Sequence, residues 1–363
     1  MLLKKLPTIR LSRIMLVMSM LFCLLTSGHL KKGLAQTNSA QIDATLWQKA
    51  QKLHQNAYVA DAHLHKIIFN ETSLPDEERK KHQAGIGMLN KGGVDAAAHF
   101  FAYYPLKEET LLQRLRKDMH ALEQNMNNHQ ARAVLLKNGP INTKDSNFCI
   151  IPGLEYFFGV FDGNIAVVDS LAALGIRTIT LMNNEHDKIS YTKDDKSQAL
   201  NSFGKQIINH LNAHNIRIDI SHLPDDLQLE VIKHSSQPVI ASHSPIRGVV
   251  NRERNLSDKV LDALAKKGGV VMITFNSGDL AGLESGRCAI ADLVAHINYA
   301  VARVGVKHVG IGSDFNGAGL RSPKGLENAA GFPLITYHLL KDGYNEEEVT
   351  QIIGKTFVNW FNQ

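Results

Sequence analysis

Short apolar runs alternate with amphipathic segments along most of this chain, and this alternation constrains the fold more than any other feature. The runs are β-branched or almost continuously apolar, which predicts strands covered on both faces. Strands that alternate with helices favour a parallel sheet, and eight such units predict an α/β fold closed into a (β/α)8 TIM barrel. The eight predicted strands are Tyr58–Asp61, Val94–Phe101, Phe148–Gly153, Arg177–Leu181, Arg217–Ser221, Pro238–Ser242, Gly269–Phe275 and His308–Gly312.

The segments between the strands have the 3.6-residue period of helices. Gly175, Gly268 and Gly305 follow three of them, at positions where a left-handed residue commonly ends a helix. A glycine-rich stretch, Asn316–Phe332, separates the last strand from a closing helix. The predicted helices are Leu46–Asn56, Leu111–Asn127, Asn164–Leu174, Asn201–His214, Leu227–Ser235, Ser257–Lys267, Ala289–Val304 and Asn345–Phe361.

The N-terminal segment has the layout of a secretory signal. Four basic residues precede an uncharged apolar stretch at residues 14–26. A stretch of about 13 residues is short for a membrane span, so we expect a signal peptide at residues 1–35 and one barrel domain at 36–363. This predicts export to the periplasm or the extracellular space. Lys31 and Lys32, between the apolar stretch and the expected cleavage site, leave an uncleaved N-terminal membrane anchor as the alternative.

The net charge argues against a nucleic-acid partner. The whole chain carries a formal charge of +5, and residues 1–35 contain six Lys and Arg and no acid. Removing those six charges leaves a mature chain near −1, so the pI of 8.9 reflects mainly the signal. A basic patch is the usual electrostatic mark of nucleic-acid binding, and this composition does not provide one.

Four histidines stand at the C-terminal ends of predicted strands, which a barrel gathers on the face where barrel enzymes keep their active sites. His63 and His65, at positions i and i+2, point the same way and can reach one ion. His222 and His243 each follow a strand, one βα unit apart. A single such histidine can be a buried structural residue or bond a backbone carbonyl. Two at equivalent strand ends favour a metal site, since neutral imidazole is a common zinc ligand.

Two carboxylates and an arginine complete the predicted site. Glu155 can bridge two ions ~3.5 Å apart, the spacing of two-metal hydrolases; its other possible role is to cap the following helix. Asp314 can transfer a proton between nucleophile and leaving amine, or can simply form a turn within Asp-Phe-Asn-Gly. Arg254 suits recognition of a carboxylate or of developing oxyanion charge, although many arginines of this kind only face solvent.

These residues make the chain resemble the membrane dipeptidase (renal dipeptidase) family of zinc peptidases, from about Val59 to Trp360. The resemblance is carried by the following motifs: Asp-Ile-Ser-His222, Pro-Val-Ile-Ala-Ser-His243-Ser, Arg254-Asn255, Gly-Gly-Val-Val-Met272, Gly153-Leu-Glu155 and Gly310–Gly317.

The resemblance implies a binuclear zinc site, with two Zn²⁺ per chain. His63 would bind one ion, His222 and His243 the other, and Glu155 would bridge them. A metal-bound hydroxide would attack the peptide bond of a dipeptide, Asp314 and Glu155 would serve in catalysis, and a homodimer is expected.

Three residues depart from the family pattern. His65 stands where a carboxylate ligand is expected; imidazole still binds zinc, but the site loses one negative charge, so we expect a more electrophilic metal pair. Asn183 replaces a substrate-contacting histidine, for which His186 could compensate, and Tyr156 replaces a glycine beside Glu155. Asn183, Tyr156 and Arg254 are thus the predicted substrate-binding residues, and the substrate need not be an ordinary dipeptide.

Two other functions remain open from the sequence. His-x-His after a first strand is also typical of a broader barrel superfamily, whose members act on N-acyl amino acids or lactones. The departures at His65 and Asn183 also allow a homologue that binds ligand but has lost efficient catalysis.

Overall fold

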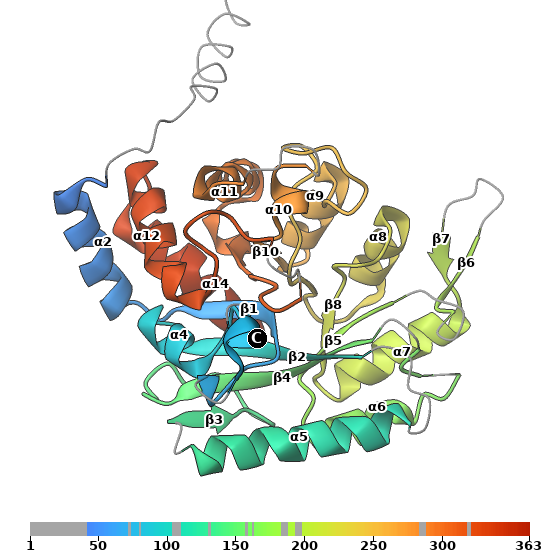
Figure 1. Cartoon of the computed structure of the whole chain (residues 1–363). Coiled ribbons are helices and arrows are strands. Elements are labelled where there is room, and N and C mark those ends of the chain that lie inside the picture. Colours follow the sequence, from blue (N-terminus) through green and yellow to red (C-terminus); the bar gives the residue numbers. More distant parts are fainter. Residues whose placement is uncertain are drawn as a thin grey trace, which may run out of the picture. The chain divides into compact units, whose positions relative to one another are not determined.

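The predicted strands form one parallel sheet wound into a barrel, shown in Figure 1, within a compact unit that runs from Thr45 to Gln363. Each strand pairs with the next in a parallel register. The strands are β1 (Ala60–His65), β2 (Ala96–Tyr103), β4 (Phe148–Tyr156), β5 (Thr178–Thr180), β8 (Arg217–Asp219), β9 (Ile240–Ala241), β10 (Val270–Ile273) and β11 (Val309–Ile311).

This computed structural model describes residues 42–363, except 72–73, 80, 104–109, 130–131, 157–158, 162, 183–187, 193–197, 283–287 and 318–320. The predicted signal peptide and the substrate-binding candidate Asn183 lie outside the described residues, as does His186. In the part of the chain that is described, no helix combines the length and the apolar character that crossing a membrane requires.

The first and last strands meet at a seam that nearly closes the barrel. The Asp314 amide donates to the His63 carbonyl at 2.8 Å, and the His65 amide donates to the Phe315 carbonyl at 2.8 Å. These bonds lie just beyond the end of β11, so they join the segment after β11 to β1. The seam therefore places Asp314 beside the two histidines of β1.

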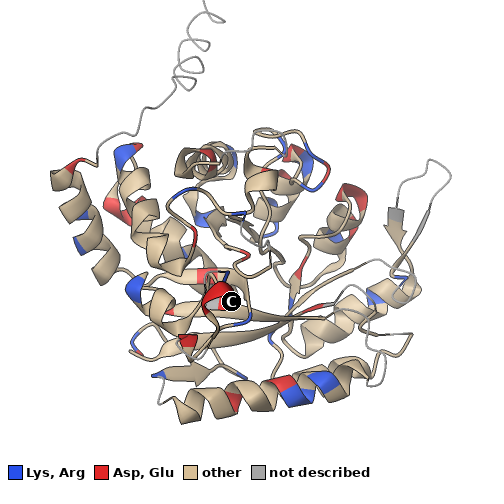
Figure 2. Cartoon of the chain, viewed as in Figure 1, with Lys and Arg blue, Asp and Glu red and all other residues tan. Residues whose placement is uncertain are grey.

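Helices cover the outside of the sheet. In Figure 1, α5 lies below the strands, α7 lies to their right, and α9, α11 and α12 lie above them. Lys and Arg residues are interspersed with Asp and Glu on these helices (Figure 2). The larger helices are α2 (Ala44–Asn56), α5 (Leu111–Asn128), α6 (Val167–Leu174), α7 (Ser202–Ala213), α8 (Asp225–His234), α9 (Asp258–Lys266), α11 (Ile290–Val304) and α12 (Phe332–Lys341).

Local signals set several helix boundaries. Thr110 and Gln113 form a reciprocal capping box at the start of α5, which satisfies backbone donors that the first turn leaves free. At the start of α7 the Asn201 side chain accepts from the Gly204 amide, and at the start of α9 the Ser257 side chain accepts from the Val260 amide. Gly175 ends α6 with a φ of 88°, a left-handed conformation that costs glycine little.

The chain also forms elements that the strand–helix pattern did not predict. The closing helix is interrupted by a π-helical turn and consists of α13 (Glu346–Thr350), η4 (Gln351–Lys355) and α14 (Thr356–Phe361). The glycine-rich stretch runs directly into α12, which the prediction missed. Smaller unpredicted elements are β3 (Ala133–Leu135), the antiparallel hairpin β6 (Ser190–Thr192) and β7 (Gln198–Leu200), α3 (Asp76–Arg79), α4 (Ile86–Lys91), α10 (Ser277–Leu280), η2 (Val306–His308) and η3 (Ala329–Gly331).

Side chains fill the barrel interior, so it is a packed core rather than a channel. Ala60, Ala96 and Ala98 are small residues on β1 and β2, and they belong to the same buried cluster as Trp360 of α14. At the N-terminal ends of the strands, the Arg217 guanidinium lies over the Trp360 ring, 5.7 Å from its centroid. With that end covered by α14, the C-terminal ends of the strands remain as the place for a site.

Candidate metal centre

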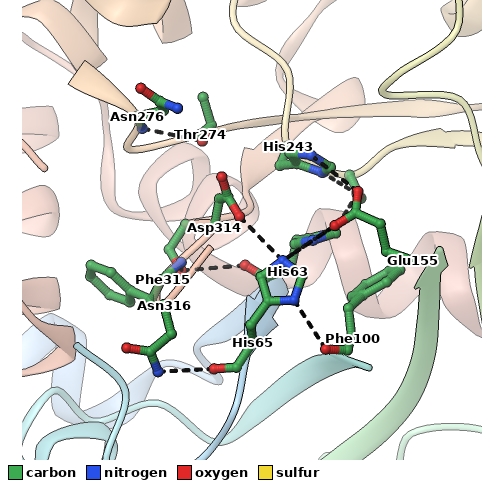
Figure 3. A network of polar contacts seen from close by, with 12 residues as sticks. His63, His65, Phe100, Glu155, His243, Thr274, Asn276, Asp314, Phe315 and Asn316 are labelled. Carbon is green, nitrogen blue, oxygen red and sulfur yellow. Dashed lines mark hydrogen bonds and ion pairs between the residues drawn. The ribbon is translucent and has the colours of Figure 1, made fainter. Parts of the chain in front are cut away.

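The four predicted histidines and Glu155 converge inside the barrel at the C-terminal ends of the strands, and most of them appear in Figure 3. His63 and His65 lie within β1 and Glu155 within β4, rather than after these strands as predicted, because both strands extend further than the sequence indicated. His222 and His243 follow β8 and β9. His63 is fully buried, and His65, Glu155 and His243 nearly so.

The histidines form two pairs whose Nε2 atoms face one another. His63 Nε2 lies 3.2 Å from His65 Nε2, and His222 Nε2 lies 2.9 Å from His243 Nε2. Two imidazole nitrogens that are both unprotonated repel at such distances unless a cation lies between them. Each pair therefore marks one position for a positive charge.

Glu155 lies between the pairs and presents one oxygen to each. Its Oε2 is 3.6 Å from His63 Nε2 and 3.3 Å from His65 Nε2. Its Oε1 is 2.9 Å from His222 Nε2 and 3.7 Å from His243 Nε2. This is the arrangement expected of a carboxylate that bridges two ions.

Ser242 fixes the orientation of one histidine in each pair. Its hydroxyl donates to Asp219 Oδ2 at 2.7 Å. Because that proton is used, Ser242 Oγ must accept from His63 Nδ1 at 2.8 Å and from His243 Nδ1 at 2.9 Å. Both imidazoles then carry their proton on Nδ1 and turn an Nε2 lone pair towards the centre, as outer partners do in metal sites.

Asp219 is fully buried and anchors this arrangement. Its Oδ1 accepts from the Ser221 hydroxyl at 2.6 Å and from the Ser242 amide at 2.9 Å, and its Oδ2 also accepts from Thr180 at 2.7 Å. On β1, the His65 Nδ1 donates to the Phe100 carbonyl at 3.0 Å, which leaves its Nε2 free for the centre.

The donor set fits divalent cations. Glu155 Oε1 is buried, yet no group in the described part of the chain donates a hydrogen bond to it with suitable geometry, and a cation would satisfy it. Burial lowers the pKa of His243, and so does the neighbouring His63, so that this ring keeps a lone pair. Imidazole nitrogen with carboxylate oxygen is a donor set that zinc and similar metals prefer.

Electrostatics at the first pair also favour a cation. Burial alone lowers the pKa of His65, but the carboxylates of Asp314 and Glu155 outweigh it and raise that pKa to about 10. Burial by itself would raise the pKa of Glu155, but the facing imidazoles of His222, His63 and His65 outweigh burial and hold this pKa well below its usual range. The carboxylates therefore stabilise a positive charge beside His65. Either a proton or a metal ion can supply that charge.

Asp314 lies beside the pair formed by His63 and His65. Its Oδ1 lies 3.4 Å from His65 Nε2, and its φ of 59° is left-handed, an uncommon conformation for a non-glycine residue that often occurs at functional sites. A Cβ at Gly317 would lie 2.1 Å from Asp314 Oδ1 and 2.5 Å from His65 Cδ2. Only glycine at 317 leaves room for these two side chains.

Of the predicted substrate-binding residues, Arg254 lies beside the centre. Its guanidinium donates to the His243 carbonyl at 2.9 Å and to Ser244 Oγ at 3.2 Å, so its charge is held near the second histidine pair. The Tyr156 backbone ends β4, and its side chain is outside the described residues. The roles predicted for Arg254, Tyr156 and Asn183 stay predictions.

Sequence reasoning missed the residues that orient the histidines. The repeated Ser-His dipeptide, Ser221-His222 and Ser242-His243, could have indicated that serine hydroxyls lie beside the histidines. Phe100 was also missed; its ring stacks on His63 with centroids 3.8 Å apart and fixes the plane of that imidazole. Asp61 is another residue that sequence reasoning missed. Its Oδ2 accepts a hydrogen bond from the Ser313 hydroxyl at 2.5 Å, and this bond joins β1 to the segment that carries Asp314.

A (β/α)8 barrel with two inward-facing histidine pairs and a carboxylate between them defines a metal-binding barrel. Comparison with known proteins agrees with this class. The family described as membrane dipeptidase (peptidase family M19) matches residues 47–363, and the chain belongs to that family.

A curated relative supports the family assignment, and two solved structures share the fold. Dipeptidase 3 of Macaca fascicularis is 31% identical over 231 residues, which are 61% of this chain and 46% of that protein, so the chain spans about half the length of the curated relatives it matches. The probable dipeptidase PvdM of Pseudomonas aeruginosa shares the fold at a TM-score of 0.72 and 19% identity, over 88% of this chain and 98% of that chain. A metallo peptidase of Rhodobacter sphaeroides was solved with a phosphinate mimic of the dipeptide L-Ala-D-Ala. It shares the fold at a TM-score of 0.68 and 19% identity, over 84% of this chain and 98% of that chain.

Proposed function

We propose that the chain is an exported zinc-dependent dipeptidase that binds two Zn²⁺ ions. The observation that carries this proposal is Glu155, whose two oxygens face two different pairs of imidazole nitrogens. His63 and His65 would hold one ion, His222 and His243 the other. When bound, the two ions would activate water and polarise the scissile carbonyl.

The protein's own groups would orient substrate and move the proton. Asp314, 3.4 Å from His65 Nε2 and only partly exposed, would take a proton from the attacking water and pass it to the leaving amine. Arg254, held beside His243, would place a fixed positive charge near the substrate carboxylate or the developing oxyanion. Buried surroundings strengthen both effects, because water is largely excluded.

The proposed substrates are dipeptides or similar small amides. Support comes from the family and from the Rhodobacter sphaeroides neighbour, which was solved with a mimic of L-Ala-D-Ala. His65 distinguishes this chain, because imidazole supplies no negative charge where a carboxylate is expected. We therefore expect a metal pair that polarises its substrate more strongly and binds anions more readily.

A specific observation favours a second candidate function. His63 and His65 direct both Nε2 atoms to one point, which is the His-x-His geometry predicted for barrel enzymes that cleave N-acyl amino acids or lactones. A binding homologue with little catalysis is the remaining alternative.

Metal analysis of the purified protein, together with turnover of L,L and L,D dipeptides, N-acyl amino acids and lactones, separates these functions. Two zinc ions with dipeptide cleavage support the dipeptidase. Two zinc ions with turnover of only the other substrates support the second function. Binding of dipeptides without turnover of any substrate would leave the binding homologue.

Asp314→Asn tests the proton transfer directly. We expect kcat to fall by ~10²–10⁴-fold while both metal equivalents remain. His65→Ala is the matched comparison, because it should lose metal from the first site as well as activity. Wild-type kcat in Asp314→Asn would make Asp314 a turn residue, and unchanged metal content in His65→Ala would remove His65 from the centre.

Export and dimerisation complete the proposal. The basic and then apolar layout of residues 1–35 supports a cleaved signal, and sequencing the N-terminus of protein recovered from the periplasm or medium tests it. An intact N-terminus in the membrane fraction would indicate the anchor instead. The homodimer rests on the resemblance alone, and sedimentation of the purified protein tests it.

A further inference from the structure

A second group of metal-ligand side chains lies on the outside of the barrel. His210 and His214 are on the last turn and the C-terminal cap of α7, and Asp169 is in the first turn of the neighbouring α6. His210 Nε2 lies 3.1 Å from Asp169 Oδ1, and His214 Nε2 lies 2.8 Å from the same oxygen. One ligand atom from each residue lies within 4.8 Å of the others.

The spacing along α7 suits metal binding. Residues i and i+4 are neighbours on one face of a helix, and the rings of His210 and His214 have centroids 5.2 Å apart. Around a tetrahedral ion with bonds of ~2.0–2.1 Å, donor atoms lie ~3.3 Å apart. The two nitrogen–oxygen distances are a few tenths of an ångström shorter than this, so small rotations of exposed side chains would open the site.

The positions in the helices favour the charges that such a site needs. The C-terminal end of α7 carries the negative end of the helix dipole, which stabilises a cation beside His210 and His214. The first turn of α6 carries the positive end, which stabilises the ionised carboxylate of Asp169. Two imidazoles with one carboxylate select zinc, copper or nickel over calcium or magnesium.

From this geometry we infer that Asp169, His210 and His214 form a surface site for a divalent transition-metal ion, separate from the barrel centre. His214 precedes β8 by three residues, so the site lies towards the N-terminal ends of the strands, at the opposite end of the barrel from Glu155. An ion there would tie α6 to α7. All three side chains are at least one-third exposed, so the remaining coordination positions are open to water.

Zn²⁺ titration of the full-length protein by calorimetry tests the site. We expect the wild type to bind one equivalent more than the double variant His210→Ala/His214→Ala, with lower affinity for that equivalent than for the barrel ions. Asp169→Asn keeps the size of the side chain but removes its charge. It should weaken binding of the additional equivalent by more than the ~10–100-fold loss that follows removal of an outer partner.

The matched control is His120→Ala/His129→Ala, which removes one exposed histidine of α5 and one at its C-terminal cap; among the described residues, neither belongs to a group of metal-ligand side chains. This control should retain every equivalent of the wild type. Equal stoichiometry in the wild type and the α7 double variant would overturn the inference, and so would an equal loss in the α5 control. None of these variants changes a residue of the barrel centre. The difference in bound Zn²⁺ equivalents therefore does not depend on whether the chain is a dipeptidase.

Discussion

Replacing Ser242 by alanine is the sharpest test of how the centre is organised. The Ser242 hydroxyl donates to Asp219 and accepts from His63 and His243, one histidine from each pair. Ser242→Ala removes the shared acceptor while leaving every predicted ligand in place. The two rings are then free to move their proton from Nδ1 to Nε2, and a protonated Nε2 cannot bind a metal.

The size of the effect follows from these contacts. Loss of an outer partner lowers metal affinity or activity ~10–100-fold, and here one substitution affects a predicted ligand in each histidine pair. We therefore expect both ions to bind ~10–100-fold more weakly. In the metal-free protein two buried N–H groups lose their acceptor, at ~1–3 kcal/mol each, so the free energy of unfolding should also fall by ~2–6 kcal/mol.

Competition with a chromogenic chelator measures both affinities on protein whose fold is checked by circular dichroism. Ser221→Ala is the matched control: the Ser221 hydroxyl donates to the same Asp219 at 2.6 Å, and among the described residues it makes no bond to an imidazole ring. Ser242→Thr keeps the hydroxyl and should retain more affinity than Ser242→Ala. If Ser221→Ala and Ser242→Ala weaken metal binding equally, or if only one ion is affected, the shared-acceptor argument is wrong.

Three further predictions follow from contacts around the centre and in the core. Gly317→Ala would put a methyl group 2.1 Å from Asp314 Oδ1, so kcat should fall by roughly 10²-fold or more if Asp314, the proposed proton carrier, is displaced; kcat within twofold of wild type would contradict this displacement. Phe315→Ala empties a fully buried position at the barrel seam and should cost ~3–5 kcal/mol in urea unfolding, whereas a loss below ~1 kcal/mol would mean that the seam repacks. His296 accepts from the Ile246 amide through Nδ1, and burial lowers its pKa from 6.5. Metal-free protein should therefore lose stability as the pH falls below 6.5, by up to ~1.4 kcal/mol per pH unit until the folded pKa is reached. His296→Gln should reduce that slope, and an identical slope in the variant would assign it to other groups.

Much of the fold was predictable because apolar period and strand–helix alternation are local properties. Each predicted strand is present, and α6 ends at Gly175 as predicted. The strand ends were predicted less well: β1 runs on to His65 and β4 to Tyr156. These extensions carry the polar side chains of predicted metal ligands, and neighbouring strands rather than hydrophobicity decide that these side chains are buried.

The missed α12 has a similar cause. It begins with Phe332 and Pro333 directly after a glycine-rich stretch, a composition that indicates loop. Its apolar face is stabilised by tertiary packing, since Phe332 lies against the rings of Phe275 and Phe315. Those contacts join segments far apart in the chain, which a local pattern does not reveal.

The sequence by itself determined the barrel and the kinds of ligand at the strand ends, because residue type and spacing along the chain are enough to identify both. Only the tertiary structure decided how those ligands are paired and held. That Glu155 turns one oxygen to each histidine pair, and that Ser242 serves His63 and His243 together, depends on distances between residues up to 179 positions apart. Such distances are set by sheet register and by the closing seam, and no local run of amino acids records them.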